Sequence, residues 1–290
     1  MRKWLAVLSV AVAIAILAGC SGSGSGPGGS KSIKLAYVAW DSEIASTHVV
    51  KEVLESKLGY KVEMLQVDAG PMWAGIADGS ADAMVAAWLP STHASYMEKY
   101  AKDIEDLGPN LDGTKIGLTV PAYMDIQSIE DLKKPETAEA LKRQIIGIEP
   151  GAGIMMATEK ALQEYGLSDY TLVESSSAAM AQELLKAYEA KQPIVVTGWT
   201  PHWMFAAMDL KYLDDPKGVY GGAEQIHTMV RKGLKEDKPD AYAFLDRFQW
   251  TPDDMAEVMI AIQDGKSPED AAKDWVESHA DKVSEWLNET

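Results

Sequence analysis

The chain has 290 residues, of which 47% are hydrophobic, and it carries a formal net charge of −17. That hydrophobic content is typical of a packed globular protein and excludes a disordered one. The strong negative charge disfavours nucleic acid as a partner, because phosphates repel an acidic surface. With a single cysteine, the chain forms no internal disulfide.

The first residues have the pattern of an export signal. Arg2 and Lys3 form a short positive segment, and residues 4–17 are almost wholly apolar. An apolar stretch of about 14 residues is short for a membrane span, which takes roughly 20, but it suits the core of a signal peptide. We therefore predict a signal peptide over residues 1–19.

A run of small residues then leads into Cys20, in the order Leu-Ala-Gly-Cys. This resembles the bacterial lipoprotein cleavage box, which implies that Cys20 becomes the lipidated first residue of the mature chain. Residues 21–30 are nearly all Gly and Ser, a composition typical of flexible linkers. We expect residues 20–31 to anchor a folded domain to the extracytoplasmic face of the cell membrane.

The remaining chain alternates short apolar runs with helical patterns. In its first half we predict strands at 32–39, 61–66, 82–87 and 116–120, and helices at 43–58, 72–78 and 92–101. Ser42 and Ser91 are predicted to cap the first and third of these helices. In the second half we predict strands at 145–148, 194–197 and 226–231, helices at 154–165 and 177–190, and amphipathic helices from residue 237 onward.

Strands that alternate with helices predict a parallel or mixed sheet covered by helices. Single-strand connections near 116–120 and 226–231 divide this α/β fold into two lobes joined by two hinge crossings. Ligands of such sheets lie in the cleft between the lobes, at the carboxyl ends of strands. We predict that lobe 1 comprises 32–118 and 225–290, and that lobe 2 comprises 119–224.

Tryptophans stand where three of the predicted strands end, at Trp40, Trp88 and Trp199. A single tryptophan at such a position is most often a packing residue, but three from both halves favour a ligand cage. A quaternary ammonium has no N–H to donate. Aromatic faces attract it through their quadrupole, by about 0.5–2 kcal/mol per ring.

The loop Glu-Pro-Gly-Ala-Gly at 149–153 opens a predicted helix. It is either an ordinary strand–helix turn or an anion site made of unpaired backbone N–H groups at the positive end of the helix dipole. The Gly-Lys-Ser/Thr of a nucleotide-binding loop is missing. His93 follows Trp88 by five residues; it either donates to the same anion or is a surface residue near a helix start.

Other function classes have weaker support. His48, His202, His227 and His279 lack the spacing and paired carboxylates of a zinc site. A secreted hydrolase would need an activated nucleophile, and no Gly-x-Ser-x-Gly elbow is found. A purely structural lipoprotein would leave the three tryptophans unexplained. We expect neither an enzyme nor a bound metal or cofactor.

Several of these motifs resemble the glycine betaine/proline betaine-binding proteins of osmoprotectant ABC importers. The resemblance lies in residues 36–46, 69–73, 87–90, 147–155 and 197–204, and it covers roughly residues 33–287. It implies that Trp40, Trp88 and Trp199 form a cage around the ligand's quaternary ammonium. It also implies that the backbone amides of Gly153 and Ile154, together with His93, bind the ligand carboxylate.

The resemblance implies a two-lobed, periplasmic-binding-protein-like (type II) α/β fold. It also implies a binding protein that captures a small zwitterionic quaternary-ammonium ligand, glycine betaine or proline betaine, and delivers it to the transmembrane permease of an ABC importer. Choline, carnitine and dimethylsulfoniopropionate are alternative ligands, because an aromatic cage accepts any compact onium group. The anion site favours a ligand that bears a carboxylate.

Overall fold

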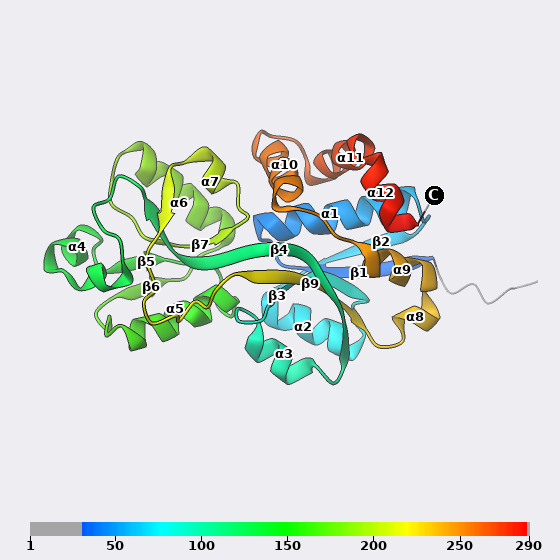
Figure 1. Cartoon of the computed structure of the whole chain (residues 1–290), viewed down its shortest axis with the longest axis horizontal. Helices are drawn as coiled ribbons and strands as arrows, with labels where there is room; N and C mark the ends of the chain where they lie inside the picture. Colours follow the sequence, from blue (N-terminus) through cyan, green and yellow to red (C-terminus); the bar gives the residue numbers. More distant parts are fainter. Residues whose placement is uncertain (1–30, 289–290) are drawn as a thin grey trace, which may run out of the picture. The chain divides into compact units, whose positions relative to one another are not determined.

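The computed structural model describes residues 31–288 (Figure 1). The predicted signal peptide, Cys20 and most of the predicted linker lie outside these residues. Within the described part of the chain, no helix is both long enough and apolar enough to cross a membrane.

Nine strands form a mixed sheet within residues 31–288, in the order β2-β1-β3-β9-β4-β7-β5-β6, with β8 beside β4. The pairs β1–β2, β1–β3, β5–β6 and β5–β7 are parallel, whereas β9 and β4 run antiparallel to their neighbours. The strands are β1 (Ser32–Tyr37), β2 (Lys61–Gln66), β3 (Ala83–Leu89), β4 (Ile104–Pro121), β5 (Gln144–Ile146), β6 (Thr171–Val173), β7 (Val196–Thr200), β8 (Leu210–Tyr212) and β9 (Glu224–Arg231).

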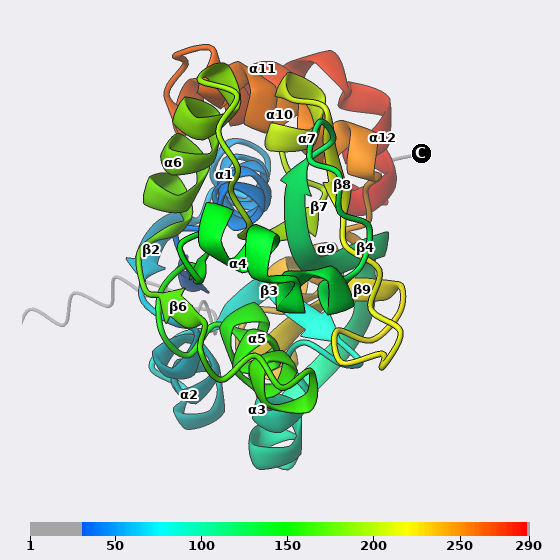
Figure 2. The ribbon, with the colours of Figure 1, turned by 90° about the vertical axis from the view of Figure 1, so that its left-hand side faces the viewer.

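Helices cover both faces of the strands. The helices are α1 (Asp41–Ser56), α2 (Ala69–Asp78), α3 (Ala94–Tyr100), η1 (Ile129–Lys133), α4 (Pro135–Ala140), α5 (Gly153–Glu164), α6 (Ser177–Glu189), α7 (Met204–Ala207), α8 (Leu234–Asp237), α9 (Pro239–Arg247), α10 (Pro252–Gln263), α11 (Pro268–Ser278) and α12 (Ala280–Leu287). Helix α1 packs against α10 and α11 on one face of β1–β3, and α2 and α3 lie on the other (Figure 1). In the second half, α5 and α6 lie on opposite faces of the strands (Figure 2).

Strand β4 joins the two halves of the sheet. It pairs with β9 as far as Thr114, and with β7 from Lys115 onward. The strands β1, β2, β3 and β9 therefore belong to one lobe, and β5 to β8 belong to the other. The predicted two-lobed α/β fold is confirmed, and the residues at which each lobe ends remain a prediction.

Both predicted serine caps are wrong. Helix α1 begins at Asp41, because the carbonyl of Trp40 already accepts hydrogen bonds from the backbone N–H groups of Glu43 and Ile44, at 3.0 and 2.8 Å. Ser42 therefore lies inside the helix and is buried. Ser91 lies in a turn before α3, where its backbone N–H donates to the carboxylate of Glu224, and His93 is the N-cap residue.

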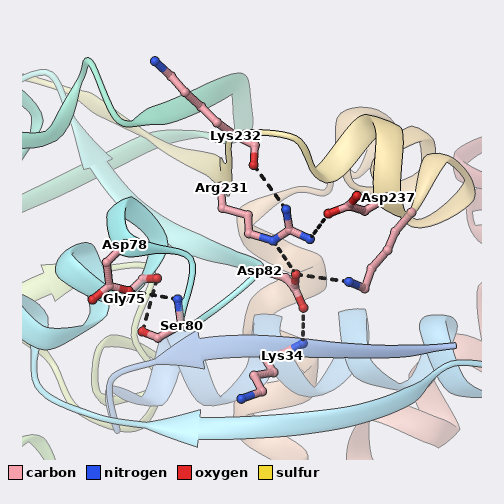
Figure 3. Close-up of polar contacts among 9 residues, drawn as sticks. Lys34, Gly75, Asp78, Ser80, Asp82, Arg231, Lys232 and Asp237 are labelled. Carbon is pink, nitrogen blue, oxygen red and sulfur yellow. Dashed lines mark hydrogen bonds and ion pairs between the residues drawn. The ribbon is translucent and has the colours of Figure 1, made fainter. Parts of the chain in front are cut away.

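A charged network at Asp82 joins strands of lobe 1 at the amino end of β3 (Figure 3). The Asp82 carboxylate accepts from the backbone N–H of Lys34 at 2.8 Å and from Nε of Arg231 at 2.7 Å. Arg231 also donates to Asp237 at 2.8 Å, and Nζ of Lys238 lies 3.4 Å from Asp82. These charges satisfy one another, so the network holds β1, β3 and β9 together with α8.

Some of the tryptophans pack in the hydrophobic core. The Trp275 ring stacks on Trp286 at 5.7 Å, and its edge-to-face contact with Trp250 has the same centroid distance. Phe248 packs edge-to-face on Trp286 at 5.0 Å. These four rings are buried under the C-terminal helices, so they are structural and the cleft draws on other tryptophans.

Candidate functional site

One cavity is lined by residues of both lobes. All six predicted ligand residues line it. Its walls are formed by Trp40, Trp88, Thr92, His93, Ile116, Ile148, Ala152, Gly153, Ile154 and Trp199. The sequence did not single out Thr92, Ile116 and Ile148, whose neutral side chains carry no signal of their own.

The three tryptophans are buried, and each has its indole N–H bonded outside the cavity. Nε1 of Trp88 donates to Glu43 at 2.8 Å, Nε1 of Trp40 donates to Glu149, and Nε1 of Trp199 donates to the Ser42 hydroxyl at 3.3 Å. None of the three acceptors lines the cavity. The bonds fix the orientation of the rings and direct their polar edges away from the ligand space.

His93 presents a hydrogen-bond donor to this cavity. It is fully buried, and its Nδ1 accepts the backbone N–H of Trp88 at 3.0 Å. Burial lowers the pKa of His93 to about 3, so the ring is neutral and its single proton resides on Nε2. Nε2 is buried and has no partner among the described residues. An unpaired buried donor of this kind is costly unless a ligand accepts from it.

The amino end of α5 supplies two further donors. Gly153 and Ile154 are its first two residues, and Ala152 at the N-cap makes no side-chain capping bond. The backbone amides of Gly153 and Ile154 have no acceptor among the described residues. Together with the helix dipole they favour an anion. The cavity thus combines aromatic rings, which suit an onium group, with three N–H donors, which suit a carboxylate.

The two lobes touch at the edge of this cavity. The Tyr96 hydroxyl of α3 donates to the carbonyl of Gly151 at 2.7 Å. Gly153 lies so close to Thr92 that a Cβ added at residue 153 would stand 2.3 Å from the Thr92 carbonyl oxygen. Glu224 holds the Thr92 loop in place by accepting its backbone N–H at 2.8 Å.

Asp41 bridges the lobes from the first turn of α1. Its carboxylate accepts from the Ser177 hydroxyl at 2.8 Å and from Nε1 of Trp203 at 2.9 Å, and Nε2 of His202 lies 3.3 Å away. Burial alone would raise the pKa of Asp41, but His202, Ser177 and Trp203 together lower it to about 2. Asp41 is therefore ionised at neutral pH. We call this set of contacts the Asp41 bridge.

Asp41 and Glu43 were not predicted from the sequence as site residues. Acidic residues are frequent in the first turn of any helix, where they interact favourably with the dipole, so their positions carried no specific signal. Within residues 31–288 no group of three His, Cys, Asp or Glu side chains is placed to hold a metal ion.

The chain is similar in sequence and fold to known proteins. Residues 31–278 match the family described as the substrate binding domain of ABC-type glycine betaine transport system. A glycine betaine/carnitine transport binding protein of Listeria monocytogenes is 57% identical over 157 residues, which are 53% of this chain and 52% of that protein. The match thus spans about half the length of this relative.

Two solved structures are also similar. Lactococcal OpuAC, in its closed-liganded conformation complexed with glycine betaine, has a TM-score of 0.83 at 48% identity, covering 88% of this chain and 99% of that one. An ABC-transporter choline binding protein in complex with choline also has a TM-score of 0.83, at 27% identity, covering 89% and 92%. The chain therefore belongs to the family of substrate-binding domains of ABC-type glycine betaine transport systems.

Proposed function

We propose that this protein captures glycine betaine outside the cytoplasm and delivers it to the permease of an ABC importer. The observation that carries the proposal is one cavity in which three tryptophan rings share the wall with three N–H donors that have no acceptor among the described residues. A betaine carries an onium group at one end and a carboxylate at the other, and this wall offers a partner for each.

Each group in the cavity has a role in this proposal. The rings of Trp40, Trp88 and Trp199 surround the trimethylammonium group and attract it by cation–π interaction and apolar contact. The carboxylate accepts from Nε2 of His93 and from the amides of Gly153 and Ile154, which replace the water it loses on entry. Because these groups come from both lobes, the ligand favours the arrangement in which the lobes are closed.

Proline betaine and carnitine also carry a carboxylate and remain candidate ligands, and a relative is named for carnitine. Choline has a hydroxyl in place of the carboxylate. It would leave donors of the anion site unpaired, and buried unpaired donors cost free energy. We therefore expect glycine betaine to bind more tightly than choline.

The cage can be tested at Trp199. Trp199→Ala should weaken glycine betaine binding by roughly 1–3 kcal/mol, because a ring and its apolar contact are lost. Trp199→Phe should lose less, because an aromatic face remains. Isothermal titration of both variants measures the difference. If both bind glycine betaine as tightly as the wild type, Trp199 is not part of the cage and the proposed ligand class is wrong.

We also propose that a lipid on Cys20 holds the protein at the membrane. The support is the small-residue run before the only cysteine and the Gly/Ser segment after it. Cys20→Ala should release the protein from the membrane fraction without changing its affinity for glycine betaine. Fractionation combined with fatty-acid labelling is the measurement. A variant that remains membrane-bound and labelled would overturn the anchor proposal and leave the ligand proposal untouched.

A further inference from the structure

Two of the three cage tryptophans donate their indole N–H to a carboxylate. Trp88 donates to Glu43, and Trp40 donates to Glu149. Glu43 is fully buried in the first turn of α1, and Glu149 is half-buried in the loop before α5. Both acids stand behind the rings and neither lines the cavity.

Among the described residues, the groups that act on the Glu43 carboxylate are the neutral side chains of Trp88, Ser46 and Ser42, so no cation explains its burial. Its carboxylate contacts the indole of Trp88 at 2.8 Å and the Ser46 hydroxyl at 3.4 Å. Burial raises its pKa from 4.5 to about 7, although the hydrogen bonds from Trp88 and Ser46 oppose the rise. An acid buried without a cationic partner destabilises the fold at neutral pH. Its presence therefore suggests a role in function.

The onium group of the ligand accounts for such a role. A carboxylate that accepts an indole N–H polarises the ring and increases the electron density on its face. Its charge also acts on the cavity through a medium of low dielectric constant. We propose that Glu43 and Glu149 supply, through the indoles of Trp88 and Trp40, the negative charge by which the cage selects a cation over a neutral group of the same shape.

The placement behind the rings also explains why the acids do not line the cavity. A quaternary ammonium cannot donate a hydrogen bond, so a carboxylate in the wall would gain little from it. The same carboxylate would repel the ligand's own carboxylate and would attract primary amines and metal cations. The rings of Trp88 and Trp40 lie between the acids and the ligand. The acids therefore make no contact with the ligand and act on it only through electrostatic attraction, which an onium group can use.

This inference rests on the proposed function, and the variant Glu43→Gln tests it. The amide oxygen of Gln still accepts the Trp88 N–H, so the ring keeps its position and only the charge is lost. Glu98→Gln, on the exposed surface of α3, is the matched control for the change in net charge. The probes are glycine betaine and 3,3-dimethylbutanoate, in which a neutral carbon replaces the ammonium nitrogen, titrated at pH 8.

We expect Glu43→Gln to bind glycine betaine about tenfold more weakly than wild type and Glu98→Gln, a loss on the scale of one cation–π contact. Affinity for 3,3-dimethylbutanoate, measured directly or by competition, should not fall. An equal loss for both probes, or no loss for glycine betaine, would overturn the inference. A wild-type protein that fails to bind glycine betaine would instead overturn the proposed function.

A pH profile gives an independent readout. Glycine betaine affinity of the wild type should rise several-fold from pH 6 to pH 8 as Glu43 ionises. Most of that rise should be absent from Glu43→Gln, which retains Glu149. Among the neighbouring groups, His93 is neutral and Asp41 ionised throughout this range, and burial raises the pKa of Glu149 as well. A rise as large in the variant as in the wild type would assign the titration to another group and overturn the role of Glu43.

The stability of the ligand-free protein should fall with rising pH, whereas its affinity for glycine betaine rises. The pKa of Glu43 is raised on folding, so the ionised acid lowers stability as the pH rises from about 4.5 through 7. Glu43→Gln removes that loss, and its ligand-free melting temperature at pH 8 should equal or exceed the wild-type value. If Glu43→Gln binds glycine betaine more weakly but is at least as stable as the wild type, Glu43 acts in selectivity and not in folding. A melting temperature below the wild-type value would mean that Glu43 contributes to folding.

Discussion

Gly153→Ala should weaken glycine betaine binding by about 3 kcal/mol, or roughly 100-fold, without lowering the stability of the ligand-free protein. The added Cβ would stand 2.3 Å from the carbonyl oxygen and 2.5 Å from Cγ2 of Thr92. A backbone carbonyl cannot swing aside as a flexible side chain does. The clash is therefore relieved by separating the lobes, which removes the amides of α5 from the ligand carboxylate.

Gly70→Ala, inside α2, is the matched control, because its Cβ would meet nothing closer than the Tyr96 hydroxyl at 3.6 Å. We expect this control to bind like the wild type. Titration calorimetry gives the affinities, and solution scattering at saturating ligand reports whether the variant still closes. If Gly153→Ala binds normally, the contact with Thr92 is not a condition for binding. If its melting temperature falls sharply, the substitution has disturbed lobe 2 itself.

His93→Asn should weaken glycine betaine binding by about 1.5–3 kcal/mol, the value of a hydrogen bond to a charged group. The side-chain oxygen of Asn can still accept the Trp88 backbone N–H, as Nδ1 does now at 3.0 Å, so the loop should keep its shape. What is lost is the donor on Nε2. Choline has no carboxylate, so its affinity should barely change.

The two ligands are titrated against the wild type and the variant under identical conditions, and the ligand-free melting temperatures are compared. A loss shared equally by glycine betaine and choline would mean that His93 shapes the cavity without binding the carboxylate. The amides of Gly153 and Ile154 would then be the only donors of the anion site.

The parts of the fold that follow simple patterns could be predicted from the sequence. The strand at 61–66 and the helix end at Gly79 lie where they were expected. The first two-thirds of β4 could not be predicted, because residues 104–114 contain Gly108, Pro109 and Gly113, which ordinarily mark turns. The register with β9 shifts three times along this stretch, which accommodates the breakers. That pairing depends on a strand more than a hundred residues away.

In the site, too, residues marked by a local pattern could be predicted, and residues placed by long-range packing could not. Trp40, Trp88 and Trp199 were found because strand ends line clefts in α/β sheets, and all three line the cavity. Their roles toward the ligand remain predictions. The acceptors behind them could not be found in this way, since whether Glu43 and Glu149 face an indole or solvent depends on packing between segments far apart in the chain.

The Asp41 bridge allows affinity and selectivity to change independently. Its contacts with Ser177 and Trp203 lie outside the cavity wall, so they stabilise the closed lobes equally for every ligand. Weakening the bridge would raise the dissociation constants of betaines and choline by a common factor and leave their ranking unchanged. Mutation at these outer positions could therefore adapt the protein to scarce or abundant solute, while the choice of solute remains with the aromatic and amide groups within.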